Sequence, residues 1–330
     1  MKSKMTFIAV LTSMAAAVLV AVSCDKSFYE PKGYEVKDSP FLSEFLSLNE
    51  VFFASQPKTK SPNWGNIWKI TKTDVFGAAK ILAGDPMSAY ATYTLLASQQ
   101  YAFVAVAAAY GAIPASYRQY KNSTCAGYAV PNTETTINRL NYAFCDYIES
   151  LYENQGMNVV LRIPGNYSVN DLTTPIDESM IVYPNQYQYL ENVGVFHNNI
   201  LDIMDNTNYQ FVNVEDYELI FDADMEDLND SLVVRASRII DVITEDFSYD
   251  DFFDGTDPIG AVLLAFEDLY DNYVNSLYDV ETIVNAYINT VAASNDLTEV
   301  QKTSLISALT VAAYSSIYWY DHMGFNGELI

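Results

Sequence analysis

Two clusters of acidic residues in the second half of the chain could bind a cation. The clusters comprise Asp222, Asp224 and Glu226, and then Asp250, Asp254 and Asp257. Carboxylate oxygens at alternating positions are the ligands that calcium loops supply. The first cluster departs from the EF-hand pattern, because Asp227 stands where glycine is needed and Val233 stands where the bidentate glutamate belongs. Both clusters are therefore candidate calcium sites, with a solvated acidic surface as the alternative.

Histidine chemistry is limited to His197 and His322. The chain has no H-E-x-x-H, G-x-S-x-G, P-loop, G-x-G-x-x-G or C-x-x-C motif, so nothing indicates an esterase, a cysteine enzyme or a nucleotide-binding protein. His197 shares an apolar helical face, which favours a core histidine bonded to a neighbour over a ligand. His322 falls near the end of the last expected helix, where a histidine complements the C-terminal dipole. Sequence spacing alone cannot locate a glycosidase-type carboxylate pair among so many acids.

The negative charge is concentrated in one part of the chain. The 330 residues carry 17 basic and 42 acidic side chains, a formal net charge of −25. Residues 163–330 hold three basic residues, Arg235, Arg238 and Lys302, against 30 acidic ones. This composition excludes a nucleic-acid partner, which requires basic surface. It fits a cationic partner. The 26 Tyr and 3 Trp residues permit stacking on an envelope glycan, with packing at helix interfaces as the alternative. No cofactor other than calcium is predicted.

The N-terminus has the order of residues of an export signal. Lys2 and Lys4 precede an uncharged stretch that ends in Ala21-Val22-Ser23-Cys24. A positive segment, an apolar segment and small residues before the cleavage point define a secretory signal peptide. The last four residues resemble a bacterial lipobox. The resemblance implies cleavage after residue 23 and acylation, including palmitate, of Cys24. A plain signal peptide and a membrane anchor are the alternatives.

Cys125 and Cys145 are the two other cysteines. An oxidising compartment permits a disulfide between them. Cys145 also lies on the apolar face of an expected helix, so a buried free thiol remains the alternative.

Helical periodicity dominates the chain from residue 189 onward and predicts a mainly all-α, multi-helix bundle with at most a minor β-hairpin. The hairpin strands would fall within residues 157–188 and 209–221. Thr73 and Asp74 are expected to open a helix, Asp257-Pro258 to cap another, and Thr298 with Gln301 to form a capping box.

The expected organisation follows these signals. Residues 1–23 form the lipoprotein signal peptide, 24–61 a lipidated tether with a short helix near Pro40, and 62–330 a helical domain. That domain is either one unit or two packed lobes, a neutral one over 62–160 and an acidic one over 161–330.

Residues 86–117 contain no charged side chain, and their centre is rich in alanine. Such a run can span a membrane, but several Gln, Ser and Thr side chains favour a helix or hairpin buried on all sides.

Three short fragments together resemble a group of uncharacterised exported bacterial lipoproteins. They are Lys72-Thr73-Asp74-Val75-Phe76-Gly77-Ala78-Ala79, Gly194-Val195-Phe196-His197-Asn198 and Ser315-Ser316-Ile317-Tyr318-Trp319. In that group a K-x-D-x-x-G-A segment and a small-residue apolar run precede a G-x-x-H-N motif and a C-terminal helix ending in Tyr-Trp. The apolar run here has fewer glycines. The resemblance implies an exported lipoprotein, assigns no catalytic residue and marks His197 and Asn198 as a pair.

The sequence thus predicts a lipid-anchored protein in the envelope of a Gram-negative bacterium, at the outer membrane and facing the periplasm or the surface. Its expected role is that of a non-enzymatic binding or scaffold protein. The alternatives are a carboxylate-dependent hydrolase of glycans or peptides, and a membrane-active protein that uses residues 86–117.

Overall fold

The computed structural model describes residues 40–55, 62–83, 101–124, 132–140, 143, 181–206, 234–241, 253 and 257–323. Within these ranges the chain is helical and contains no strand, so the protein is an all-α, multi-helix fold, as predicted. The labelled elements are α2 (Pro40–Ser55), α3 (Pro62–Ala83), α5 (Tyr101–Thr124), the 3-10 helix η2 (Asn185–Leu190), α7 (Glu191–Asn206), α9 (Pro258–Tyr273), α10 (Leu277–Ala293) and α11 (Glu299–His322). Residues 133–140 and 234–241 are also helical. The stretches expected to form hairpin strands lie largely outside the described residues, and residues 181–190, which are described, form no strand.

Local capping chemistry sets where helices α9 and α11 begin. The Asp257 carboxylate accepts a hydrogen bond from the Ile259 backbone N–H, with Pro258 in the first turn of α9. Thr298 and Gln301 form the reciprocal capping box predicted for α11. Both predictions are confirmed. Such caps can be predicted from the sequence because they depend on residues within three positions of one another.

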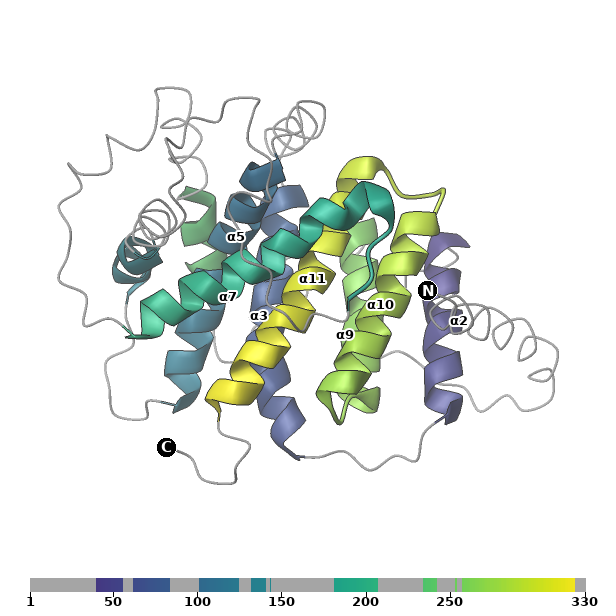
Figure 1. Cartoon of the computed structure of the whole chain (residues 1–330), viewed down its shortest axis with the longest axis horizontal. Coiled ribbons are helices and arrows are strands. Elements are labelled where there is room, and N and C mark those ends of the chain that lie inside the picture. The colour runs from purple at the N-terminus through teal and green to yellow at the C-terminus, as the bar shows by residue number, and fades with distance from the viewer. Residues whose placement is uncertain are drawn as a thin grey trace.

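Helix α11 lies at the centre of the bundle (Figure 1). Every residue from Thr303 to Ser316 is buried, so the helix has no solvent-facing side over four turns. It packs against α3, α7, α9 and α10, which surround it. A helix in this position must be apolar or small on all faces, and its Ser and Thr hydroxyls must find partners inside the protein.

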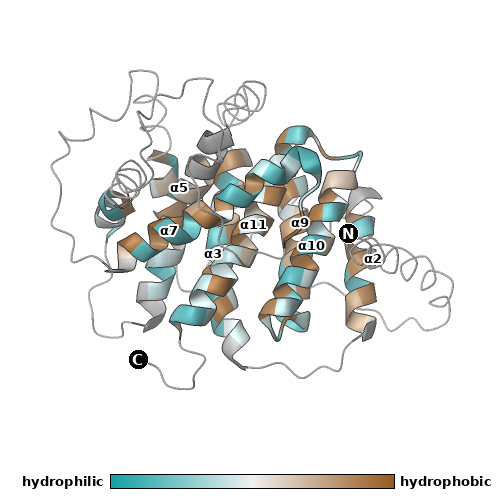
Figure 2. Ribbon diagram, in the orientation of Figure 1, coloured by the Kyte–Doolittle hydropathy of each residue, from teal (hydrophilic) through white to brown (hydrophobic). Residues whose placement is uncertain are grey.

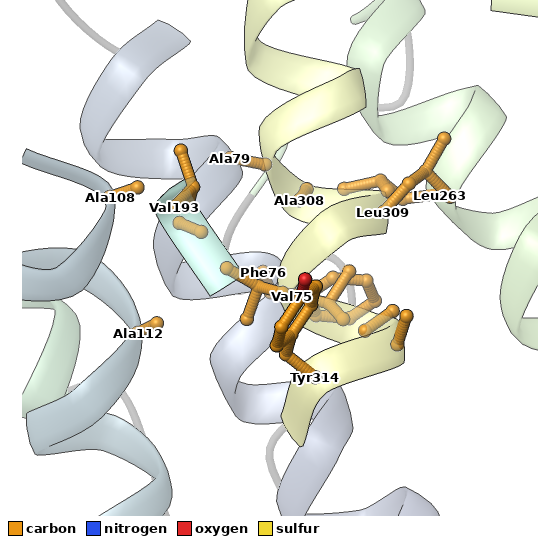
Figure 3. Close-up of a cluster of buried hydrophobic side chains, with 14 of the residues drawn as sticks. Val75, Phe76, Ala79, Ala108, Ala112, Val193, Leu263, Ala308, Leu309 and Tyr314 are labelled. Atoms are coloured by element: carbon orange, nitrogen blue, oxygen red, sulfur yellow. The ribbon is translucent and has the colours of Figure 1, made fainter. Parts of the chain in front are cut away.

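Helices α3 and α5 touch through their backbones. A Cβ atom added to Gly77 would lie 2.7 Å from the carbonyl carbon of Gly111, and one added to Gly111 would lie 2.7 Å from that of Gly77. Alanines flank this contact, and Figure 3 shows Ala108 and Ala112 of α5 beside the apolar cluster that includes Ala79 and Val193. The small side chains of α5 therefore allow a close helix–helix approach.

This contact explains the described part of the uncharged segment. Residues 107–117 are buried within the bundle, in agreement with the prediction of a helix buried on all sides. Pro114 lies inside the same helix. None of the described helices combines the length and the apolar character needed to cross a bilayer. Since the bundle covers residues 107–117, this stretch offers no apolar face to lipid.

The expected helix start at Thr73 and Asp74 is wrong. Helix α3 runs unbroken from Pro62, so both residues lie in its interior. Thr73 donates its hydroxyl to the Ile70 carbonyl, and both side chains are fully buried. A threonine followed by an aspartate resembles a cap in sequence. Here the helix continues through both residues: Thr73 bonds within its own helix, and Asp74 accepts hydrogen bonds from the distant Ser315 and Trp319.

Helix α2 lies at the edge of the bundle, against α9 and α10 (Figure 1). Along α2 and α10 hydrophobic and hydrophilic residues alternate, as expected of helices with one buried face (Figure 2). Phe45 and Phe52 provide the apolar contact, with ring centroids 5.3 Å from Tyr287 and 4.9 Å from Tyr273 respectively. Between them, the buried Asn49 donates to the Ala265 carbonyl at 2.7 Å and accepts from the Tyr287 hydroxyl at 2.7 Å.

Replacing Asn49 with alanine is expected to weaken the docking of α2. The substitution leaves the buried Tyr287 hydroxyl without its acceptor, which costs about 1–3 kcal/mol. In Asn49→Ala, amide hydrogen exchange in α2 should be faster than in the unsubstituted chain, whereas exchange in α11 should stay the same. The exposed Ser47 of the same helix supplies the control, because Ser47→Ala should leave exchange within experimental error. Equal protection of α2 in the two variants would contradict the role given to Asn49.

Candidate functional site

Asp74 is the centre of a buried polar cluster between α3, α7 and α11. Its side chain has no solvent exposure. One carboxylate oxygen, Oδ2, accepts the Ser315 hydroxyl at 2.5 Å and the Trp319 indole N–H at 3.4 Å. The other oxygen, Oδ1, lies 3.4 Å from Nε2 of His197. Asp74 therefore joins one helix from the first part of the chain to two from the second.

His197 is held from its other side by its neighbour in sequence. Its Nδ1 atom lies 2.9 Å from the amide oxygen of Asn198. The Asn198 amide nitrogen donates to the Tyr314 carbonyl of α11 at 2.9 Å. The imidazole is fully buried, as expected for a core histidine, and the pair marked by the sequence resemblance is a contacting pair.

A glycine permits this close approach of α7 to α11. A Cβ added to Gly194 would lie 2.7 Å from Cε2 of the Tyr314 ring and closer to two other ring atoms. Tyr314 is almost completely buried, so its ring has little room to move. Gly194 thus has a steric role, bringing the following His197 and Asn198 within hydrogen-bonding distance of α3 and α11.

A second polar contact lies beside the first, one residue further along α11. Ser316 donates its hydroxyl to the Ala312 carbonyl, so the Tyr270 hydroxyl, 2.7 Å away, is the donor to Ser316. The Tyr270 ring stacks on Trp68, with centroids 4.1 Å apart. Burial raises the pKa of the Tyr270 hydroxyl, so it stays a neutral donor over the physiological range.

An ion pair links α3 to α9 nearer the surface. The Lys72 ammonium lies 2.6 Å from a Glu267 carboxylate oxygen, and both side chains are 18% exposed. Burial raises the pKa of the Glu267 carboxyl, and the positive charge of Lys72 opposes that rise. Lys72 belongs to the same fragment as Asp74, so this fragment makes polar contacts with three neighbouring helices, α7, α9 and α11.

The cluster contains the residue types of a catalytic triad but not its connections. In a triad the serine hydroxyl donates to the imidazole, and the carboxylate binds the opposite ring nitrogen. Here the Ser315 hydroxyl donates to Asp74, and Nδ1 of His197 faces an amide oxygen instead of a carboxylate. Ser315 also lies within a fully buried helix, so a substrate carbonyl has no access to it in this conformation. The arrangement can hold helices together and share a proton, but it does not present an activated nucleophile.

The structure places few of the other residues singled out in the sequence. Asp222, Asp224, Glu226, Asp250 and Asp254 lie outside the described residues, as do Cys24, Cys125 and Cys145. Asp257 is the cap of α9. Within the described part of the chain, no three His, Cys, Asp or Glu side chains come together as a metal site. The calcium sites and the disulfide therefore stay predictions.

His322 lies in the last turn of α11, as expected. Its Nδ1 atom lies 2.9 Å from the Tyr318 carbonyl, so that nitrogen carries the proton, and the ring stacks on Tyr318 with centroids 3.8 Å apart. Its Nε2 atom lies 3.6 Å from a carboxylate oxygen of the exposed Asp202. These contacts hold the C-terminal end of α11 against α7.

Asp74 and Ser315 were not singled out as site residues from the sequence. The sequence feature that pointed to these residues was the resemblance of three fragments to a group of lipoproteins. The structure brings these three fragments into contact at Asp74, His197 and Ser315. A charged residue within an apolar helix is a further signal, since a buried carboxylate requires partners.

Comparison with known proteins gave no match: no protein-family model matches the chain, and neither curated proteins nor solved structures showed significant similarity to it. The fold and the cluster thus define an all-α protein organised around a buried aspartate–histidine–serine contact.

Proposed function

We propose that the chain is an exported lipoprotein, anchored through acylated Cys24, that acts as a binding or scaffold protein at the cell envelope. The proposal of a binding or scaffold role, as opposed to an enzymatic one, rests on the burial of the polar cluster around Asp74. Its members have hydrogen-bond partners within the protein, and Asp74, His197 and Ser315 have no solvent-exposed surface. Groups arranged in this way stabilise a body that presents other surfaces to partners.

The anchoring part of the proposal is supported by the N-terminal sequence. Lys2 and Lys4, the uncharged stretch and Ala21-Val22-Ser23-Cys24 follow the order expected of a lipoprotein signal. Several acyl chains on one cysteine give a stable anchor, because each buried methylene contributes about 0.8 kcal/mol.

The charge distribution supports a cationic partner. From Asp257 to Met323 the chain holds nine acidic residues and one basic residue, Lys302. Some of these acidic side chains have partners within the protein. Asp257 caps the start of α9, and Glu267 forms an ion pair with Lys72. The resulting field attracts positive ligands and repels nucleic acid.

Cys24→Ala tests the anchor. Expressed in a Gram-negative host, the unsubstituted chain should remain with the membranes after a high-salt wash, and its N-terminal peptide should carry the mass of the acyl chains. Cys24→Ala should lose the acyl mass and leave the washed membranes. Ser23→Ala is the matched control, because it keeps a small residue before the cysteine and should behave as the unsubstituted chain does. An unmodified N-terminal peptide in the parent would overturn the lipoprotein assignment.

Binding is tested separately with the purified full-length chain. A cationic peptide should bind with an affinity that falls steeply with salt, whereas a neutral oligosaccharide should show little binding. If the chain hydrolysed either probe, and substitution of an Asp or Glu within the residues that the structure describes abolished this activity, the result would favour a hydrolase over a binding protein.

A further inference from the structure

Helices α7 and α11 bring their C-terminal ends together at the surface of the bundle. His322 is the last residue of α11, and Asp202 lies one turn before the end of α7. The contact between these two side chains places the two helix ends side by side. Each helix C-terminus carries a partial negative charge, and α7 has no basic residue in its last turn. The field at this point therefore favours a cation.

The imidazole of His322 is held in place by two contacts with Tyr318. Its Nδ1–H donates to the Tyr318 carbonyl at 2.9 Å, because a backbone carbonyl can only accept. The ring also stacks on the buried side chain of Tyr318, with centroids 3.8 Å apart. In the neutral imidazole this leaves the Nε2 lone pair as the ligand atom. Histidines that bind metal ions are oriented in the same way, through a hydrogen bond from the other ring nitrogen.

The carboxylate of Asp202 faces the Nε2 atom of His322. One of its oxygens lies 3.6 Å from Nε2, and both side chains reach solvent, at 51% exposure for Asp202 and 31% for His322. Zinc binds imidazole nitrogen and carboxylate oxygen at about 2.0–2.2 Å, so a tetrahedral angle between these bonds separates the two ligand atoms by about 3.4 Å. The observed spacing therefore needs only a small adjustment of two exposed side chains to hold one ion.

The types of ligand atom indicate the class of ion. Calcium and magnesium take oxygen ligands, whereas an imidazole nitrogen suits zinc, copper and nickel. We propose that His322 and Asp202 form a binding site for a divalent transition-metal ion, with zinc as the expected ion, that joins the ends of α7 and α11. Within the residues that the structure describes, no third His, Cys, Asp or Glu completes the group, so water fills the other positions.

This site is independent of the lipid anchor, of the cationic partner and of the acidic clusters expected to bind calcium. Its two protein ligands are fewer than the four of a structural zinc site. Zinc bound here therefore adds a link between two helices that are already folded, and the fold does not depend on it.

Zinc binding to the purified full-length chain is the direct test. Isothermal titration with zinc chloride is carried out in excess calcium, which occupies sites made of carboxylates alone. His322→Gln should weaken zinc binding at least about tenfold, because even the loss of a residue behind a metal ligand costs about 10–100-fold. Asp202→Asn should also weaken it. Zinc affinity unchanged in His322→Gln, or no binding to the parent, would overturn the proposal and leave an ordinary exposed ion pair.

Asp321→Asn is the matched control for Asp202→Asn. Asp321 is exposed beside His322, and its substitution removes the same charge without removing a proposed ligand. Because charges exposed to solvent are screened by salt, zinc affinity should stay within about twofold of the parent. An equal loss in the two variants would show that zinc responds only to the general negative charge, which contradicts a site at His322.

Copper provides a spectroscopic readout of the same site. With Cu²⁺ in place of Zn²⁺, the electron paramagnetic resonance spectrum should show coupling to one imidazole nitrogen, and His322→Gln should remove it. His197 does not contribute this signal, since its side chain is fully buried. Circular dichroism without metal should be the same for the parent and for the variants, so that lost binding is not lost structure. A nitrogen signal that persists in His322→Gln would contradict the assignment.

Discussion

Gly77→Ala is expected to destabilise the protein by more than about 4 kcal/mol, a loss large enough to unfold many domains. The added methyl group would lie 2.7 Å from the carbonyl carbon of Gly111 and closer still to its oxygen. The obstacle is the backbone of α5, which cannot rotate away as a flexible side chain can. Helices α3 and α5 would have to separate, and Asp74, one turn from Gly77, would move away from His197 and Ser315.

Gly65→Ala is the matched control, since Gly65 lies in the same helix and its added Cβ would meet nothing within 4 Å. Replacing a helical glycine in open space removes backbone entropy from the unfolded chain, so a gain of about 0.5–1 kcal/mol is expected. Thermal unfolding followed by circular dichroism should therefore move the two variants in opposite directions. Similar midpoints for the two variants would show that the close approach of α3 and α5 is unimportant.

Asp74→Ala should cost about 2–5 kcal/mol, because two buried donors lose their acceptor and each unsatisfied group costs about 1–3 kcal/mol. The Ser315 hydroxyl and the Trp319 indole lose their acceptor, and the His197 imidazole loses the carboxylate that it faces. Asp74→Asn should cost less than Asp74→Ala, because an amide keeps the volume and one acceptor oxygen. Urea unfolding at neutral pH measures both changes.

Asp321→Ala controls for the loss of a carboxylate in general. Asp321 is exposed near the end of α11, and its substitution should change stability by no more than about 0.5 kcal/mol. If Asp74→Ala matched Asp321→Ala, the cluster would contribute nothing to the packing of α3, α7 and α11. A double-mutant cycle with Ser315→Ala then measures the coupling across the 2.5 Å contact, which should exceed about 0.5 kcal/mol.

The sequence predicted the helical class and several helix boundaries because these depend on nearby residues. Apolar side chains at helical spacing predicted α9, α10 and α11, and the caps at Asp257 and Thr298 require residues at most three positions away. For the uncharged run the sequence predicted a buried helix or hairpin, and the described residues 107–117 are a buried helix, which fits because charged side chains are costly to bury.

The sequence failed where a polar residue serves a distant partner. Thr73 and Asp74 were expected at a helix start, since that is where such residues are found when only local hydrogen bonds are considered. In the folded chain Asp74 contacts Ser315, 241 positions away, and one oxygen of its carboxylate accepts hydrogen bonds inside the bundle. Gly77 and Gly194 gave no local signal for their role, because that role depends on the neighbouring α5 and α11.

The sequence by itself therefore determined that this chain forms helices, where several of them begin, and that its second half is strongly acidic. Only the tertiary structure decided that the fragments containing Asp74, His197 and Ser315 meet. The physical reason is that helix formation and capping are governed by short-range backbone hydrogen bonds and apolar spacing. Pairing of buried polar groups instead requires the exact crossing of α3, α7 and α11, which glycine contacts and the packed core set together.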